Sequence, residues 1–472
     1  MKTTHLLYCT VLIFICSFYS CSKSPGYNSW KEINSFRLLK ADGSSFSPAE
    51  ISIRYTKDSI LLTLPYNTNL NPLTPVFNIT GISVSPASGV PQNFESPVNY
   101  TVTAEDGSTA VYTVIVSKQK APGIVYFGCN DNFFYALDAA TGKLVWKFQG
   151  SASFTYSSPT YANGNIYVGG IDNNVYAFNA YNGNVIWQKK IATTGIESDA
   201  VFHNGTLYVG TNDDYLYALN ASNGDIKWSF LTGGNVSASP TIWNGTVYFG
   251  SSDGKLYALD ANTGSPKWHY QTGAMINQSG PALANGVIYV GSRDGYLYAI
   301  DALAGQLVWR FSGEGISFEQ SSPTVSRGIV YIGSWYNVPA FSEKGCVYAV
   351  NAGKGQLVWK QLNNTGVSSS PSVASGIVYI TADDSKIHAL NANTGTSIWS
   401  KVILPNSASP AVSENIVYVG GGGNRFFYAF DALSGVEKWR FALGANALST
   451  SCPLILKSSG NADYAGDSGL LQ

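Results

Sequence analysis

Six aspartates stand at the same point of successive sequence repeats, and a ring of carboxylates could bind cations or a basic partner. Each lies in the turn predicted between the second and third strands of its repeat. They are Asp131, Asp172, Asp214, Asp253, Asp294 and Asp384. Several are followed by Gly or Asn, a combination that tight hairpin turns favour. The pattern therefore favours a structural role, with the carboxylates shaping the turns, over a cation site.

Three cysteines lie beyond the N-terminal segment: Cys129, Cys346 and Cys452. In an exported protein they would meet an oxidising compartment. Aligning the repeats sets Cys452 near the start of a closing strand and Cys129 at the end of its antiparallel neighbour, so a disulfide between them is predicted. A slip of one residue in this register would reverse the facing and separate the two thiols. Cys346 is expected to be a packed, unpaired thiol.

Other residues suited to catalysis form no recognisable set. The four histidines (His5, His203, His269 and His388) occupy unrelated places, and no metal-ligand spacing is visible. Neither a G-x-S-x-G elbow nor a Gly-rich phosphate loop occurs. Only 12% of residues are charged and the net charge is −1, which argues against a nucleic-acid surface. No catalytic or metal-binding residue is therefore predicted.

The N-terminus has the features of an export signal. Lys2 precedes an apolar run from Leu6 to Tyr19, which is shorter than the roughly 18 residues of a membrane-spanning helix. Ser20-Cys21 and a polar stretch follow, and this arrangement resembles a bacterial lipoprotein signal. The resemblance implies a signal peptide over residues 1–20, lipidation of Cys21 and anchoring to a membrane surface without a span. A secretory signal cut nearby is the alternative.

Residues 33–118, after a linker over 21–32, predict a small first domain. Short alternating apolar runs predict strands, and Asp106-Gly107 predicts a hairpin turn. The domain is interpreted as an immunoglobulin-like β-sandwich. The stretches "NPLTPVFNITG" and "SPVNYTVTAEDGSTAVYTV" resemble the immunoglobulin-like modules that follow the lipid anchor in bacterial surface lipoproteins. We expect this domain to act as a stalk.

Residues 123–472 are one repeated unit, marked by tryptophans spaced 40 or 41 residues apart, with one spacing of 50. They are Trp146, Trp187, Trp228, Trp268, Trp309, Trp359, Trp399 and Trp439. Short strands at a period near 40 predict a β-propeller, here of eight four-stranded blades. The first unit lacks an inner strand and the last is followed by an extra one, so the C-terminal strand is expected to close the ring. The fold class is all-β.

Within the repeat, each tryptophan is predicted to lie against the neighbouring blade near the Gly of its third turn, such as Gly264. The motif "ALDAATGKLVW" resembles the tryptophan-docking motif of PQQ-like repeat proteins. That family includes PQQ-dependent alcohol dehydrogenases and the non-catalytic outer-membrane assembly lipoprotein BamB. The dehydrogenases carry adjacent cysteines, calcium ligands and a catalytic Asp, whereas no two cysteines are adjacent here. We therefore expect no cofactor, with PQQ and calcium as the alternative.

The connections between blades vary most in sequence, and variable loops on a rigid scaffold are where binding is expected. The predicted binding face comprises Phe154, Tyr156, Glu197, Asn235, Asn277, Phe318, Glu319, Trp335 and Tyr336, the last two from a long insertion in the sixth unit. The resemblance to BamB implies the leading hypothesis, which is a cell-envelope scaffold for proteins or peptides, including outer-membrane proteins, facing the periplasm or the cell surface. The alternatives are a quinone-dependent dehydrogenase and a glycan-binding surface protein.

Overall fold

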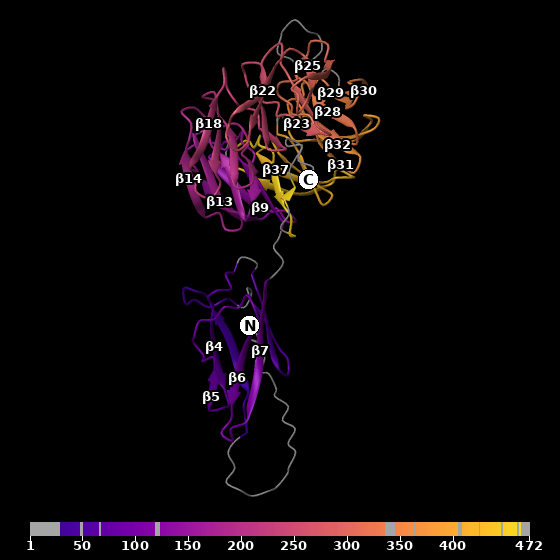
Figure 1. The fold of residues 1–472 in the computed structure, drawn as a ribbon. Coiled ribbons are helices and arrows are strands. Elements are labelled where there is room, and N and C mark those ends of the chain that lie inside the picture. Colours follow the sequence, from indigo (N-terminus) through magenta and orange to yellow (C-terminus); the bar gives the residue numbers. More distant parts are fainter. Residues whose placement is uncertain are drawn as a thin grey trace. The chain divides into compact units, whose positions relative to one another are not determined.

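The computed structural model describes residues 29–47, 51–65, 68–118, 123–335, 345–362, 365–404, 408–423, 425–444, 447–459 and 462–463. The chain divides into two compact units, one within residues 1–119 and the other within residues 120–472. Both consist of strands and turns, in agreement with the all-β prediction (Figure 1). Among the described residues, no helix has the length and apolarity needed to cross a membrane.

The N-terminal unit is a β-sandwich of two sheets around one apolar core. One sheet pairs β1 (Ile33–Leu39) with β4 (Thr74–Ile79), and the other has the order β2 (Ser52–Tyr55), β3 (Ser59–Leu64), β7 (Thr109–Lys118), β6 (Val98–Thr103), β5 (Ser83–Ser85). Alternate residues point inward, so Phe36, Phe77 and Tyr100 meet in the core, with ring centroids 5.1 to 6.3 Å apart. The predicted sandwich is confirmed.

The second unit contains eight sheets in the part of the chain that the structure describes, numbered here as blades 1 to 8. Blade 1 has the order β10 (Leu144–Gln149), β9 (Phe133–Asp138), β8 (Ile124–Gly128), β39 (Leu454–Leu456), β40 (Ala462–Asp463). Blade 2 is β11 (Thr160–Ala162), β12 (Asn165–Gly169), β13 (Asn174–Asn179), β14 (Val185–Lys190), and blade 3 is β15 (Val201–His203), β16 (Thr206–Gly210), β17 (Tyr215–Asn220), β18 (Ile226–Leu231). Blade 4 is β19 (Thr241–Trp243), β20 (Thr246–Gly250), β21 (Lys255–Asp260), β22 (Pro266–Gln271), and blade 5 is β23 (Ala282–Ala284), β24 (Val287–Gly291), β25 (Tyr296–Asp301), β26 (Leu307–Ser312).

The remaining three blades follow the same order from inner to outer strand. Blade 6 is β27 (Thr324–Ser326), β28 (Ile329–Gly333), β29 (Val347–Asn351), β30 (Leu357–Gln361), and blade 7 is β31 (Ser372–Ala374), β32 (Ile377–Ala382), β33 (Lys386–Asn391), β34 (Ser397–Val402). Blade 8 is β35 (Ala411–Ser413), β36 (Ile416–Gly420), β37 (Phe426–Asp431), β38 (Glu437–Ala442). Inner strands of neighbouring blades touch, among them β11 with β39, so the sheets surround a common axis as a β-propeller (Figure 1).

The tryptophans join each blade to the next, as predicted. Every indole N–H donates to the carbonyl of an alanine in the following blade, at 2.9 to 3.2 Å. The last of these bonds runs from Trp439 back to Ala139, 300 residues away, and therefore joins blade 8 to blade 1. Strand β39 pairs with β8, which confirms that a C-terminal strand supplies the inner strand of the first blade.

A second donor to the same carbonyls was not anticipated from the sequence. In seven blades a tyrosine of the second strand also bonds the alanine that receives the indole, at 2.8 to 3.1 Å; these are Tyr126, Tyr208, Tyr248, Tyr289, Tyr331, Tyr379 and Tyr418. Burial raises the pKa of Tyr379 to about 12, so this hydroxyl remains a donor at ordinary pH. Seven of the eight inter-blade contacts are thus fixed by two side chains from different strands.

The predicted disulfide between Cys129 and Cys452 is wrong in this structure, because both are buried thiols and neither forms a disulfide. The ladder between β39 and β8 pairs Leu454 with Tyr126 and Leu456 with Ile124. Continuing this register sets Cys452 opposite Gly128, one residue away from Cys129. The slip of one residue separates the thiols, as the period of two along a strand requires. Cys346 is a buried thiol outside any disulfide, in agreement with its prediction.

Candidate functional site

The propeller has two faces that carry different connections. Because the strands of each blade are antiparallel, its turns alternate between the two ends of the sheet. The first and third turns of each repeat lie on one face, together with the tryptophan contacts, and this is called the docking face. The second turns and the long connections between blades lie on the other, called the loop face. The predicted binding residues that the structure describes belong to the loop face.

One residue of each inter-blade connection forms a belt around the axis, two positions before the inner strand. The belt residues are Ser158, Asp199, Ser239, Gly280, Ser322, Ser370, Ser409 and Cys452. The backbone N–H of a belt residue donates to the side chain of the belt residue in the next blade. Six such bonds join described residues, for example Ser322 to Ser370 at 3.0 Å and Ser370 to Ser409 at 2.8 Å.

The local sequence explains why this belt forms. Seven of the eight belt residues are followed by proline; only Asp199 is not, because Ala200 follows it. Proline disfavours the helical conformation for the residue before it and so extends the chain at the belt position. Small hydroxyl side chains then accept a neighbour's backbone N–H close to the axis. The repeated Ser-Pro dipeptide was the signal from which the belt could have been predicted.

A second tier of residues lies two positions before the belt and varies from blade to blade. It contains Tyr156, Glu197, Ser237, Gln278, Gln320, Ser368 and Thr450. With the belt, this tier surrounds a cavity of about 140 Å³ at the loop-face end of the axis. Hydroxyl, amide and carboxylate groups line the cavity, and none of its described lining residues is Lys, Arg or His. The Tyr156 side chain is 51% exposed. The cavity is the candidate binding site.

The structure brings some of the predicted binding residues to this surface. Tyr156 and Glu197 line the cavity. Asn235 is exposed on the connection into blade 4, two residues before the lining residue Ser237. Asn277 is half-buried, and its side chain accepts a hydrogen bond from the Ser252 hydroxyl at 3.4 Å. Asp199, Gln278 and Gln320 also line the cavity. Asp199 belongs to the belt, and Gln278 and Gln320 belong to the second tier. This regularity is visible only when the connections are aligned on the inner strands.

Phe154 and Phe318 are not binding residues, and that prediction is wrong. They are 1% and 0% exposed. Phe154 lies over Gly128 of the second strand in its blade, and Phe318 lies over Gly291 in the same way. Ile196 and Ile276 occupy this position in other blades. The two phenylalanines are therefore apolar plugs between connection and sheet, which the hydrophobic effect holds inside.

Glu319 and Trp335 are tied into the protein. Glu319 is 3% exposed, and its carboxylate lies 3.8 Å from the guanidinium of Arg293. The half-buried Trp335 donates its indole N–H to Asp383 at 3.0 Å. The pKa of Asp383 is raised, mainly because neighbouring protein atoms displace water from its carboxylate. Tyr336 and most of the insertion that carries it lie outside the described residues, as does the predicted lipidation site Cys21.

The recurrent aspartates serve the turns, which is the explanation the sequence favoured. Asp253 accepts the backbone N–H of Lys255 at 2.9 Å and the hydroxyl of Tyr257 at 2.5 Å. Asp131, Asp172 and Asp294 make the same pair of contacts in their blades. Burial and the bond to Asp253 raise the pKa of the Tyr257 hydroxyl. Among the described residues, no group of three or more His, Cys, Asp or Glu is suited to a metal ion.

The third blade corrects one detail of this alignment. Asp213, rather than Asp214, occupies the recurrent position, and its carboxylate accepts the backbone N–H of Thr193 at 2.8 Å. Asp214 has a φ of 72°, matching the φ of 82° at Gly254 in the next blade. Asp214 thus adopts the left-handed conformation at a position where blades 1 and 2 have asparagine and blades 4 and 5 have glycine. The sequence contains two adjacent aspartates at this turn, and only the backbone distinguishes them.

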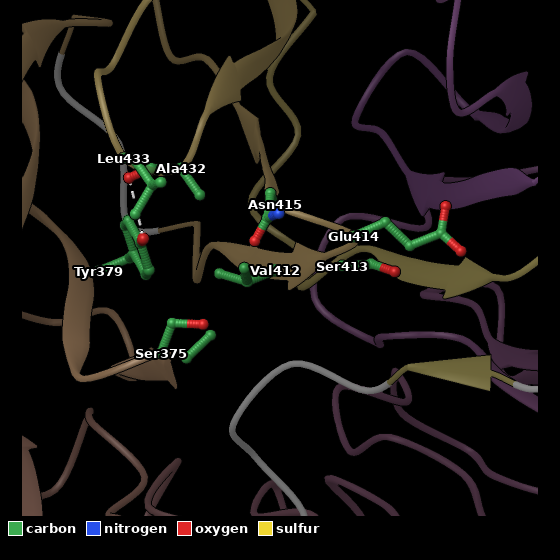
Figure 2. Close-up of a pocket in the computed structure, with 9 residues that line it drawn as sticks. Ser375, Tyr379, Val412, Ser413, Glu414, Asn415, Ala432 and Leu433 are labelled. Carbon is green, nitrogen blue, oxygen red and sulfur yellow. Dashed lines mark hydrogen bonds between the residues drawn. The ribbon is translucent and has the colours of Figure 1, made fainter.

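A second cavity, of about 170 Å³, lies on the docking face between blades 7 and 8. Figure 2 shows Tyr379 bonded to the carbonyl of Ala432 at one side of it, with Glu414 extending away from Tyr379. The first turn of blade 8 is Glu414-Asn415, with φ of 48° and 62°, where the turns of other blades place a glycine second. This cavity therefore differs from the axial one in lying between two blades, beside a turn that sets blade 8 apart.

Comparison with known proteins now adds the family. The model of the family described as "Outer membrane protein assembly factor BamB" matches residues 119–196, 172–341 and 343–470, well over half of the chain. The chain belongs to the BamB family. A second model, described as "SGBP, N-terminal", matches residues 43–116. No curated protein matches the chain.

Solved structures similar to this BamB-family chain share its fold at low sequence identity. BamB from Moraxella catarrhalis is 19% identical, with a TM-score of 0.53, covering 62% of this chain and 89% of that one. A europium-containing methanol dehydrogenase is 15% identical, with a TM-score of 0.56 and coverage of 66% and 81%. The computationally designed Ika8 protein is 15% identical, with a TM-score of 0.54 and coverage of 66% and 96%. Such likeness shows the fold alone.

The described residues do not fit the pair of PQQ and calcium. Calcium takes six to eight oxygen ligands, usually with several carboxylates, whereas the axial cavity contributes the carboxylates of Glu197 and Asp199 only. Asp199 already accepts the backbone N–H of Ser158 within the belt. The cavity of about 140 Å³ is also smaller than the roughly 300 Å³ at the lower end for small-molecule cofactors.

Proposed function

We propose that this BamB-family chain is a non-catalytic binding scaffold of the cell envelope, with protein or peptide partners that engage the loop face. One observation carries the proposal: the blades repeat closely at the docking face and at the belt, yet differ in what they expose around the axial cavity. A side chain that packs against a neighbouring blade must fit that neighbour, whereas an exposed loop is free to fit a partner. Tyr156, Asn235 and Gln278 are such exposed positions.

The lipidated N-terminus belongs to the same proposal. Lipidation of Cys21 would hold the scaffold at a membrane surface, and the β-sandwich over residues 33–118 would act as a stalk. Outer-membrane proteins are the partner class that the family description supports. Mass spectrometry of the membrane-extracted chain tests the anchor. A diacylated N-terminal peptide beginning at Cys21 is expected, and a Cys21→Ser variant should be released from the membrane fraction.

Site-specific photo-crosslinking tests the scaffold. A photoreactive amino acid replaces Asn235 on the loop face or, as a matched control, the exposed Asn262 on the docking face of blade 4. In cells that produce the full chain, we expect one recurrent protein adduct from position 235 and none from position 262. The same adduct from position 278 would map the partner across the face. Equal adducts from both faces would contradict the proposal.

The dehydrogenase alternative has its own measurement. The purified chain is titrated with PQQ and calcium, and tryptophan fluorescence reports binding while reduction of a dye with a panel of alcohols reports turnover. Saturable binding accompanied by turnover would overturn the non-catalytic proposal. We expect neither, because the axial cavity supplies few carboxylates and little volume.

A further inference from the structure

We propose that the axial cavity of the loop face binds the end of a neutral saccharide. This site shares Tyr156 and Gln278 with the loop-face surface proposed above for a protein partner. It differs in its ligand, which is the end of a saccharide held between the two tiers around the axis. The inference rests on the chemistry of the lining groups, the exposed ring of Tyr156 and the size of the cavity.

The hydrogen-bonding groups match a sugar better than an ion. The amides of Gln278 and Gln320 each offer donors and acceptors, the carboxylate of Glu197 offers acceptors, and serine hydroxyls offer both. A sugar presents adjacent hydroxyl groups that donate and accept at once. An anion would meet two carboxylates and no lining cation among the described residues. An apolar ligand would leave many polar groups without partners.

Tyr156 supplies the apolar contact that sugars also need. Its side chain is 51% exposed at the rim, while Phe154, two residues earlier, is buried as a plug. The C–H groups on one face of a sugar ring pack on an aromatic ring, and the phenol hydroxyl can bond at the edge. A tyrosine at the rim of a polar cavity therefore offers both parts of the contact.

Size limits the ligand to the end of a chain. An engineered protein cavity of about 150 Å³ binds one benzene ring, so the axial cavity of about 140 Å³ has room for about one six-membered ring. The belt fixes the cavity floor through bonds such as Ser370 to Ser409 at 2.8 Å. Binding would therefore order few groups of the protein, which favours affinity.

Saturation-transfer NMR on the purified full chain without its signal tests the inference. The probes are a panel of neutral mono- and oligosaccharides at millimolar concentration, with spermidine and a lysine-rich peptide included as cationic probes. We expect transfer to the protons of a terminal sugar ring. Tyr156→Ala should raise the Kd for the sugar at least about threefold, and Gln278→Ala should raise it about five- to tenfold.

Tyr55→Ala is the matched control, because Tyr55 is also 51% exposed but lies in the N-terminal unit. It should leave sugar binding unchanged, and unchanged melting curves show that each variant is folded. No transfer to any neutral sugar, transfer to the cationic probes instead, or binding that Tyr55→Ala reduces as much as Tyr156→Ala would each overturn the inference. These results leave the crosslinking at Asn235 unaffected, so the two proposals fail separately.

Discussion

The docking face and the axial cavity of the propeller are built from the same repeat, yet they differ in how much variation they accept. On the docking face, eight tryptophans make one contact, each to an alanine carbonyl of the next blade. Around the cavity, the belt is nearly uniform, whereas the tier above it runs from Ser237 to Tyr156. The uniform belt and the diverse tier are only two residues apart in each connection.

The difference separates architecture from binding. A uniform position is one whose side chain must fit the next blade. Each blade donates a hydrogen bond to the following blade and accepts one from the preceding blade, so every copy must keep the same groups. A diverse position has no such neighbour to satisfy. If this is correct, substitutions should cost most stability on the docking face, less in the belt and least in the upper tier.

The largest effect is expected for Gly264→Ala on the docking face. Gly264 has a φ of 72°, and an added Cβ would lie 2.7 Å from a ring carbon of Trp228. The left-handed conformation costs about 1–2 kcal/mol, and forcing the ring away adds about 1–3 kcal/mol. Urea unfolding measures the loss. Gly245→Ala is the control, because its φ is 66° with nothing within 4 Å of the added atom. Equal losses would show that the tryptophan contact adds nothing.

An intermediate effect is expected for Ser370→Ala in the belt. The Ser370 hydroxyl accepts the backbone N–H of Ser322 at 3.0 Å, and both residues are buried. Losing the acceptor leaves that N–H unpaired, which costs about 1–3 kcal/mol. Ser368→Ala, two residues earlier in the upper tier, should change the free energy of unfolding by less than about 0.5 kcal/mol. The comparison fails if the two variants unfold at the same urea concentration.

The smallest effect is expected for Asp383→Asn on the loop face. The raised pKa of Asp383 means that the folded protein holds this proton more tightly than the unfolded chain does. The carboxyl therefore favours folding at low pH and loses that contribution as pH rises through the folded pKa. Because Asp383 is exposed, solvent keeps the effect small. Urea unfolding gives the free energy of unfolding of the variant minus that of the parent, and this difference should be more favourable to the variant at pH 7 than at pH 3.5. The opposite sign would contradict the assignment.

The structure also shows where sequence reasoning failed. Phe154 and Phe318 were placed on the binding face because they occur in variable loops, but variability in a loop does not show which side chains point inward. The sequence predicts correctly that the strands next to Cys129 and Cys452 are neighbours. It predicts their register incorrectly, and that error leads to the disulfide. Asp213 and Asp214 are chemically identical neighbours, so only backbone conformation separates them. Each error concerns the facing or the exact position of single residues within a correctly predicted segment.

The sequence by itself determined the class of fold, the eight repeats, the contact between tryptophan and turn glycine, and the closure of the ring by the C-terminal strand. These depend on patterns that recur in every repeat, so a small misalignment in one copy is corrected by the others. Only the tertiary structure decided the belt, the two tiers and the polar cavity between them. Those features depend on residues some 40 positions apart that meet at the axis, where packing and register determine which side chain faces inward.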